Sequence, residues 1–289
     1  MAAGSETRAG MEGPETTSPA GGALVRRHRL STRLWHWVNA VTLLVMLMSG
    51  LMIFNAHPRL YWGEYGANSD PAWLEIGANR RGQGLLRAGP VTLETTGVLG
   101  VFTDGDGVRR HRAFPYWATI PSTYSLSEAR LWHLAFAWVL AGGWLFYLLW
   151  SLGNGHIRRD LHIARREWHP AHLWHDVKQH ARLRFPTGAA ALRYNTLQKL
   201  AYAGVLFVLL PLMIATGLAM SPGYDAATSL SALFGGRQTA RSLHFLAAFG
   251  LVVFFLIHIA MVVLAGPVNE LRSMITGWYR PPREREDKA

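Results

Sequence analysis

Four histidines lie in uncharged, apolar stretches of the sequence, where a polar side chain is costly and usually serves a function. They are His36, His133, His244 and His258. A neutral imidazole is the commonest metal ligand among side chains. The chain has no cysteine, which excludes cysteine-ligated iron–sulfur clusters, cysteine-based zinc sites, covalent c-type haem and disulfides. Any metal must therefore be held by histidine, methionine or oxygen ligands.

The stretches that carry the histidines are long enough to cross a membrane. Half of the 289 residues are hydrophobic and 12 are Trp, which is too apolar for an ordinary soluble domain. Four runs without Asp, Glu, Lys or Arg each reach the roughly 20 residues that a bilayer core requires: Leu34–Phe54, Leu131–Leu152, Leu200–Ser221 and Ser242–Ala265. As buried helices of a soluble protein, they would leave almost nothing to cover them. The sequence therefore predicts an all-α integral membrane protein, a four-transmembrane-helix bundle.

Charge predicts the orientation of this bundle, because cytoplasmic loops are enriched in Lys and Arg. The formal net charge is +11, and most of the excess flanks the first span, follows the fourth, or lies between the second and third. Topology accounts for this charge, so no nucleic-acid partner is predicted. The predicted segments are a disordered cytoplasmic tail (1–30), transmembrane helices (31–56, 128–152, 197–221, 241–265), periplasmic loops (57–127, 222–240), a cytoplasmic loop with an interfacial helix (153–196) and a cytoplasmic tail (266–289).

The long periplasmic loop has a composition of its own. Residues 88–104 contain β-branched residues bounded by Gly, and a turn sequence follows at 104–107, which predicts a small β element. The same loop carries the aromatic segment 61–66, with the sequence YWGEYG. These aromatic side chains fit either a docking site for a partner or an aromatic belt at the membrane interface.

The orientation sorts the four histidines by depth. His244 and His258 are 14 residues apart, about 21 Å of helix and close to four turns, so their rings leave the same face. His36 begins an outward span and is cytoplasmic, whereas His133 begins an inward span and is periplasmic. His36 thus matches His258 in depth, and His133 matches His244. Each pair suits axial ligation of one haem iron, which predicts two stacked b haems.

Two alternative roles account less well for the four histidines. Single interfacial histidines that reach water would explain His36 or His133, but not His258, which lies well inside its span. A di-metal site would need carboxylates, and the spans have none. Small residues at Ser49-Gly50, Gly142-Gly143, Thr216-Gly217 and Gly250 fit either flat approach of a macrocycle or close helix packing. Arg33 and Arg241 are candidate partners of haem propionates, and both also suit the predicted topology.

Three features together resemble a known family. They are Arg33-Leu-Trp-His36-Trp37, Arg193-Tyr-Asn-Thr-Leu-Gln-Lys199 and the 14-residue histidine spacing. They resemble the bacterial di-haem cytochrome b561 family over residues 25–280, apart from the long loop, and in particular the nickel–iron hydrogenase b-type and formate dehydrogenase γ subunit branch. The resemblance implies two haem b groups, a quinone site near the cytoplasmic haem and a redox partner on the opposite face. By motif, Asn195 and Gln198 neighbour the quinone, with capping of the third span as the alternative.

The function predicted from these features is electron transfer. We expect an inner-membrane di-haem cytochrome b subunit that passes electrons between a periplasmic oxidoreductase, of molybdopterin-dependent or hydrogenase type, and the quinone pool. The alternative is a stand-alone quinone oxidoreductase acting on a small diffusible substrate at the outer haem. A symmetric homodimer fits either. The histidines of the inner loop suit a metal site, a proton relay or a basic interfacial helix: His156, His162, His169, His172, His175 and His180.

Overall fold

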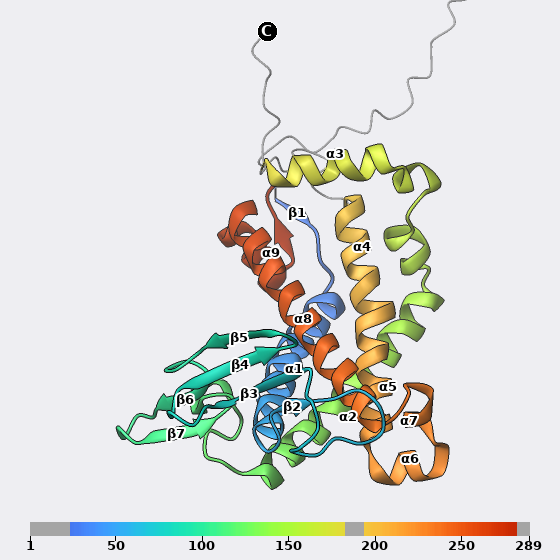
Figure 1. The fold of residues 1–289 in the computed structure, drawn as a ribbon. Coiled ribbons are helices and arrows are strands. Elements are labelled where there is room, and N and C mark those ends of the chain that lie inside the picture. Colours follow the sequence, from blue (N-terminus) through green and yellow to red (C-terminus); the bar gives the residue numbers. More distant parts are fainter. Residues whose placement is uncertain (1–23, 183–193, 282–289) are drawn as a thin grey trace, which may run out of the picture.

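The computed structural model describes residues 24–182 and 194–281. Four of its helices or helical runs are long and apolar enough to cross a membrane. They are α1 (Leu30–Asn55), α2 (Leu126–Gly153), the run Thr196–Met220 and α8 (Arg237–Ala265). Figure 1 shows them side by side as a bundle. The predicted all-α architecture with four transmembrane helices is therefore confirmed.

The third spanning run changes its winding in the middle. It consists of α4 (Thr196–Gly204), a π-helical turn at Val205–Leu209 and α5 (Leu210–Met220). Pro211 lies just after the π turn and has no amide hydrogen to donate to a carbonyl one turn earlier. Trp144 of α2 donates its indole N–H to the carbonyl of Leu206 at 2.9 Å. A neighbouring helix thus satisfies a backbone group that lipid cannot.

One end of the bundle holds both ends of the described chain, and we call it the terminal end. There β1 (Val25–Arg26) pairs antiparallel with β8 (Trp278–Tyr279), which follows α9 (Pro267–Thr276). Helix α3 (Pro170–Ala181) lies across the same end (Figure 1) and is preceded by short helical turns at Ile157–Leu161 and Arg165–Trp168. The predicted disordered tail falls mostly on residues 1–23, outside the described residues, but β1 belongs to an ordered strand pair.

The opposite end carries the predicted β element, and we call it the sheet end. A four-stranded antiparallel sheet has the order β2-β3-β4-β5, and β6 and β7 form a separate hairpin. Asp104 begins the tight turn of this hairpin, as its sequence predicts. The elements here are β2 (Arg59–Leu60), β3 (Leu74–Ala78), β4 (Gly84–Ala88), β5 (Val91–Glu94), β6 (Gly100–Thr103), β7 (Arg109–Arg112), the turn Tyr116–Ala118, α6 (Pro222–Thr228) and α7 (Leu230–Leu233).

A buried apolar cluster joins this sheet to the bundle. It consists of Phe54, Leu60, Ile76, Ala113 and Phe114, with Phe245 of α8 packed against it. The side chain of Asn55, the last residue of α1, both donates to the carbonyl of Phe114 and accepts from its amide. Because both polar ends of the buried amide are satisfied, the junction carries little desolvation penalty. The sheet end is thus continuous with the core of the bundle.

Substitution of Gly236 tests the close contact between the long loop and the start of α8. Gly236 precedes α8 with φ of 114°, and a Cβ there would lie 2.6 Å from the carbonyl oxygen of Gly63. Gly236→Ala should lower the free energy of unfolding by about 2 kcal/mol or more, because backbone atoms must move apart. Thermal unfolding in detergent measures this. Gly223→Ala, which meets no atom within 4 Å, is the control, and equal melting temperatures would contradict the prediction.

Candidate functional site

The four histidines meet in two pairs, each formed between different helices. His133 of α2 faces His244 of α8, with 6.3 Å between ring centroids and 58° between ring planes. His36 of α1 faces His258 of α8, also at 6.3 Å, with 53° between planes. We call these the sheet-end pair and the terminal-end pair. The structure thus brings together the same pairs of histidines that the sequence matches in depth.

Both pairs lie at similar depths from their ends of the bundle. His36 is six residues into α1, while His133 and His244 are seven residues into α2 and α8. His258 is seven residues before the last residue of α8. At 1.5 Å per residue, each ring is about 10 Å from the end of its helix. The two pairs are therefore stacked along the bundle axis within the apolar region.

The spacing within each pair fits a metal ion bound between two imidazoles. Two metal–imidazole bonds of about 2 Å, plus about 1 Å from each nitrogen to its ring centre, separate the centroids by about 6 Å. The observed separation is 6.3 Å in both pairs. Among the described residues, no three His, Asp or Glu side chains are grouped to hold a metal ion. Two protein ligands for each metal ion, with the remaining ligands supplied by a bound macrocycle, would match this arrangement.

Hydroxyl groups hold the rings of the sheet-end pair. Ser49 of α1 lies with its Oγ 3.0 Å from His133 Nδ1, and Thr216 of α5 lies with its Oγ1 3.0 Å from His244 Nδ1. Both hydroxyl residues are fully buried. A Cβ added to the next residue, Gly50 or Gly217, would lie 3.3 or 3.5 Å from the Cε1 atom of the same ring. Two of the small-residue pairs that the sequence analysis names, Ser49-Gly50 and Thr216-Gly217, thus lie directly against the histidines.

The other small residues have different neighbours. A Cβ on Gly143 would lie 2.8 Å from the indole of Trp35, and one on Gly250 would lie 3.3 Å from Leu209. For these two glycines the structure therefore shows close helix packing, the second of the two roles that the sequence leaves open. A Cβ on Gly142 would meet no atom within 4 Å.

Aromatic and cationic groups surround the terminal-end pair. His258 stacks on Phe254, with 6.1 Å between centroids and 13° between planes, and His36 contacts Trp37 edge-on. Arg33 approaches Gly277, and its buried Nε atom has no hydrogen-bond partner among the described residues. Such a buried, unsatisfied donor fits an anionic group such as a propionate. Arg33 thus lies one turn from His36, on the side where the sequence predicts a propionate partner.

The long loop holds the first turn of α8. The carbonyl of Gly63 accepts from the amides of Gln238 and Thr239, which satisfies two donors that a helix start leaves free. Trp73 Nε1 donates to Ser242 Oγ at 2.9 Å, and Ser242 donates to the carbonyl of Tyr61 at 2.6 Å. The loop therefore positions the helix turn that precedes His244. No local pattern in the sequence predicts this role, because the contacts join residues that are 169 to 181 positions apart.

Arg241, the other predicted propionate partner, is also engaged by the loop. Its guanidinium donates to the carbonyl of His57 and lies 5.8 Å from the ring centre of Phe54. Burial, together with Arg241 and Arg59, lowers the pKa of His57, which favours the neutral imidazole. Arg241 thus helps to hold the first turn of α8 against the long loop, and it lies one turn before His244.

Asn195 and Gln198 form a reciprocal capping box at the start of α4. Gln198 N donates to Asn195 Oδ1 at 2.9 Å, and Asn195 N donates to Gln198 Oε1 at 3.2 Å. Capping of the third span is the alternative to a quinone role. Next to this cap, Lys199 Nζ donates to Glu167 at 2.9 Å. Burial tends to raise the pKa of Glu167, but the bonds from Lys199 and the Ala164 amide outweigh burial and lower it.

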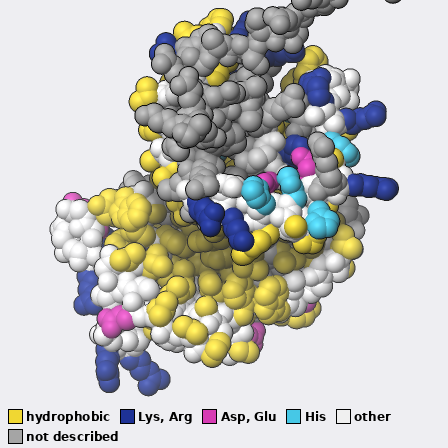
Figure 2. All heavy atoms as spheres, turned by 90° about the horizontal axis from the view of Figure 1, so that it is seen from above, with side chains coloured by type: hydrophobic (Ala, Val, Ile, Leu, Met, Phe, Trp, Pro, Cys, Tyr) yellow, Lys and Arg dark blue, Asp and Glu magenta, His cyan; other side chains and the backbone are white. Residues whose placement is uncertain are grey.

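His172 and His175 of α3 lie at the terminal end. Figure 2 shows His, Lys and Arg side chains gathered along one rim of this end. His172 Nε2 lies 3.1 Å from Thr196 Oγ1 and 3.7 Å from Asp176, which ties α3 to the start of α4. His172 thus forms a contact between α3 and α4.

Comparison with known proteins agrees with this architecture. The family described as prokaryotic cytochrome b561 matches residues 27–277. The chain belongs to the prokaryotic cytochrome b561 family. A probable Ni/Fe-hydrogenase B-type cytochrome subunit of Azotobacter vinelandii is 28% identical over 178 residues, which cover 57% of this chain and 73% of that protein. A putative protein-methionine-sulfoxide reductase subunit YedZ1 of Azospira oryzae is 30% identical over 155 residues, covering 53% and 72%.

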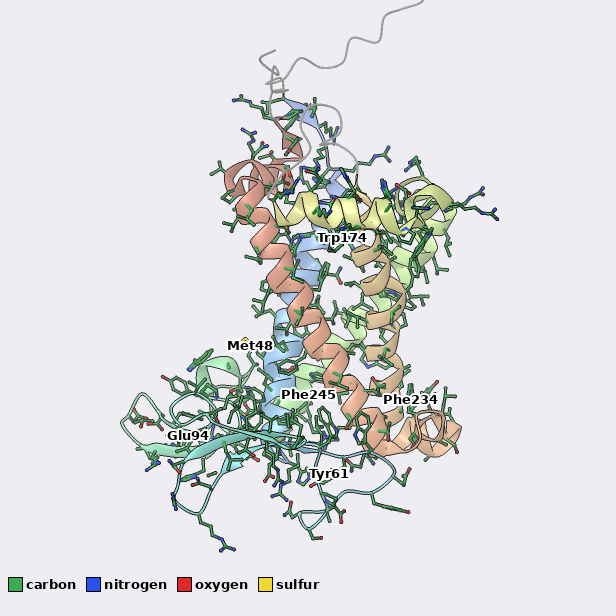
Figure 3. The ribbon with its side chains drawn as sticks, turned by 45° about the horizontal axis from the view of Figure 1, so that its top comes forward. Met48, Tyr61, Glu94, Trp174, Phe234 and Phe245 are labelled. Atoms are coloured by element: carbon green, nitrogen blue, oxygen red, sulfur yellow. The ribbon has the colours of Figure 1, made fainter. Side chains whose placement is uncertain are left out.

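Family membership fixes the broad chemistry. As a cytochrome b561, the chain is a multi-pass membrane protein that binds haem b and transfers electrons. The predicted family and the predicted b-type haem are thereby confirmed. Figure 3 shows Tyr61 and Phe245 toward the end of the cytochrome opposite to Trp174 of α3, so the start of α8 and helix α3 lie far apart.

The hydrogen bonds between the long loop and the first turns of α8 give a second prediction. Trp73→Phe removes the indole donor to Ser242 but keeps the aromatic ring, and it should lower the free energy of unfolding by about 1 kcal/mol. Thermal unfolding of the detergent-solubilised cytochrome measures the change. Trp117→Phe is the matched control, because the Trp117 side chain is 68% exposed. If both variants unfold at the wild-type temperature, the Trp73–Ser242 bond does not stabilise α8.

Proposed function

We propose that this cytochrome b561 is a di-haem subunit that passes electrons between a redox partner at the sheet end and membrane quinone at the terminal end. The observation that carries the proposal is the pair of matched histidine sites, each with 6.3 Å between ring centroids. His133 and His244 would hold one haem, and His36 and His258 the other. Bound haem supplies reversible one-electron chemistry, while the protein sets ligation, depth and surroundings.

The apolar bundle keeps the two pairs in a defined order. His244 and His258 are 14 residues apart on α8, which is about 21 Å along the helix. Arg33 and Arg241 lie within one turn of the histidines at opposite ends and would bind propionates. Because neither spanning carboxylates nor cysteines compete for a metal, the neutral imidazoles are the only strong metal ligands in the sequence of the spans.

The proposed orientation places the terminal end in the cytoplasm and the sheet end in the periplasm. The excess of Lys and Arg before the first span, after the fourth and between the second and third supports it. The membrane would then be the bacterial inner membrane, with both termini inside. The quinone would exchange at the cytoplasmic end and take up its protons from that side when it is reduced.

The proposed partner is a periplasmic oxidoreductase of hydrogenase or molybdopterin-dependent type. Both relatives carry names that describe subunits of redox enzymes, a hydrogenase and a methionine-sulfoxide reductase. The sheet end exposes aromatic side chains that suit protein contacts: Trp62, Tyr65 and Trp117 are 53%, 85% and 68% exposed. Purification from the native membrane tests this, because a stand-alone enzyme acting on a small diffusible substrate would yield one polypeptide.

Loss of a single axial histidine tests the ligand assignment. His258→Ala or His133→Ala should each halve the haem content, from two haems per chain to one, because an axial ligand to one iron is removed. The pyridine haemochrome assay with protein quantification measures the ratio. His175→Ala, which removes a histidine on α3 outside the bundle, should keep both haems. Two haems in the His258 variant would overturn the assignment of the terminal-end pair.

A fourth set of variants separates capping from quinone binding. Asn195→Ala with Gln198→Ala should weaken inhibition by a quinone analogue severalfold and, through the lost cap, lower stability by about 1 kcal/mol. Asn195→Ser with Gln198→Ala restores the N-cap acceptor and should recover stability, but not inhibition. Steady-state inhibition and thermal unfolding provide the two readouts. If inhibition recovers together with stability, the two side chains act only as the helix cap.

A further inference from the structure

Two buried hydroxyl groups make equivalent contacts with the two histidines of the sheet-end pair. Ser49 Oγ donates to the carbonyl of Val45 at 2.7 Å, and Thr216 Oγ1 donates to the carbonyl of Leu212 at 2.6 Å. Each bond runs back four residues along its own helix. Because the single hydroxyl hydrogen is used there, each oxygen can only accept from the imidazole that lies 3.0 Å away.

This arrangement fixes the tautomer of both rings. Nδ1 of His133 donates to Ser49, and Nδ1 of His244 donates to Thr216, which leaves both Nε2 atoms as lone-pair ligands. The glycine after each hydroxyl leaves room for the ring edge, since a Cβ would lie 3.3 or 3.5 Å from Cε1. The same hydroxyl-then-glycine pattern thus occurs in α1 and in α5, each beside a histidine of the helix that packs against it.

The terminal-end pair has different surroundings. The buried Nδ1 atom of His36 has no hydrogen-bond partner among the described residues, and the described contacts of His258 are with the rings of Phe254 and His36. No hydroxyl of residues 24–182 or 194–281 forms a hydrogen bond with either of these rings. The two histidine pairs therefore share one spacing but differ in what holds the ligand rings.

We propose that Ser49 and Thr216 are positioning residues that lower the reduction potential of the sheet-end haem below that of the terminal-end haem. This inference rests on the ligand assignment of the proposed function. An imidazole that donates from Nδ1 is a more basic ligand, and a more basic ligand stabilises the oxidised, more positively charged iron. The difference makes electron transfer from the sheet end to the terminal end favourable.

The transfer has a simple balance. His133 and His244 would hold the electron-donating haem and His36 and His258 the accepting one, so the one electron that the first loses is the one that the second gains. No proton moves and no bond changes, because both rings keep their Nδ1 hydrogens on Ser49 and Thr216 throughout. The hydroxyls are neutral, so they stabilise the ligand rings without adding a charge to the apolar region.

A redox titration of the purified full-length cytochrome tests the inference. Ser49→Ala and Thr216→Val should each shift the reduction equilibrium of one haem about tenfold toward the reduced form, which is about 59 mV for one electron. The double variant should shift the same haem further. The titration is repeated with His258→Ala, in which the remaining haem is the sheet-end one. There the shift should persist.

Matched variants show whether the hydroxyl itself is responsible. Ser49→Thr and Thr216→Ser keep the acceptor and should keep the wild-type potentials. Ser273→Ala removes an equally buried hydroxyl on α9, which donates to the carbonyl of Glu270, and should change neither potential. If an Ala or Val variant loses its haem, Ser49→Cys, a weaker acceptor, decides the matter. A raised potential supports the inference, and a wild-type potential overturns it.

The contradicting outcomes differ from those of the proposed function. Unchanged potentials in Ser49→Ala and Thr216→Val with two haems retained would overturn the role of the hydroxyls alone. An equal shift of both haems, or a wild-type sheet-end potential above the terminal-end one, would also overturn it. Fewer than two haems in the wild-type chain, or two haems in His133→Ala, would overturn the ligand assignment on which the inference rests.

Discussion

Helix α8 supplies one histidine to each pair, so the depth and rotation of this one helix constrain the rest of the structure. Fourteen residues are nearly four turns, which keeps His244 and His258 on one side. A shift of one residue turns a helix by about 100° and would remove both rings from their partners together. Polar contacts at both ends of α8 therefore help to specify its packing, because apolar contacts with lipid do not select the rotation of a helix.

Both ends of α8 are held by polar contacts with other segments. At the sheet end, the carbonyl of Gly63 caps its first turn, and Ser242 links it to Tyr61 and Trp73. At the terminal end, the chain continues through α9 to β8, which pairs with β1 just before α1. Arg27 and Glu270 reinforce this closure with an ion pair at 3.2 Å. The long loop is therefore part of the electron-transfer framework, whatever partner its exposed aromatic residues bind.

Sequence patterns predicted the bundle and the identity of the histidine pairs, because hydropathy, charge and helical spacing act within single segments. The same patterns carry no signal for individual hydrogen bonds between distant segments. The bonds of Ser49 to His133 and of Trp73 to Ser242 span 84 and 169 residues, and no local pattern encodes them. Strands β1 and β8 have two residues each, too few for a periodicity. Asn195 and Gln198 carry a local N-cap pattern, and the capping box that this pattern predicts is present.

The membrane limits how this cytochrome can tune its ligands. In soluble metal sites a carboxylate often accepts the free imidazole N–H, which gives a strongly basic ligand. A carboxylate inside the apolar region would cost several kcal/mol, and the four spans predicted from hydropathy contain none. Hydroxyls bonded to their own helix carbonyls are small, neutral and already satisfied, so they can accept without an unpaired group. Ser49 and Thr216 thus offer the ligand rings neutral acceptors that suit this depth of the membrane.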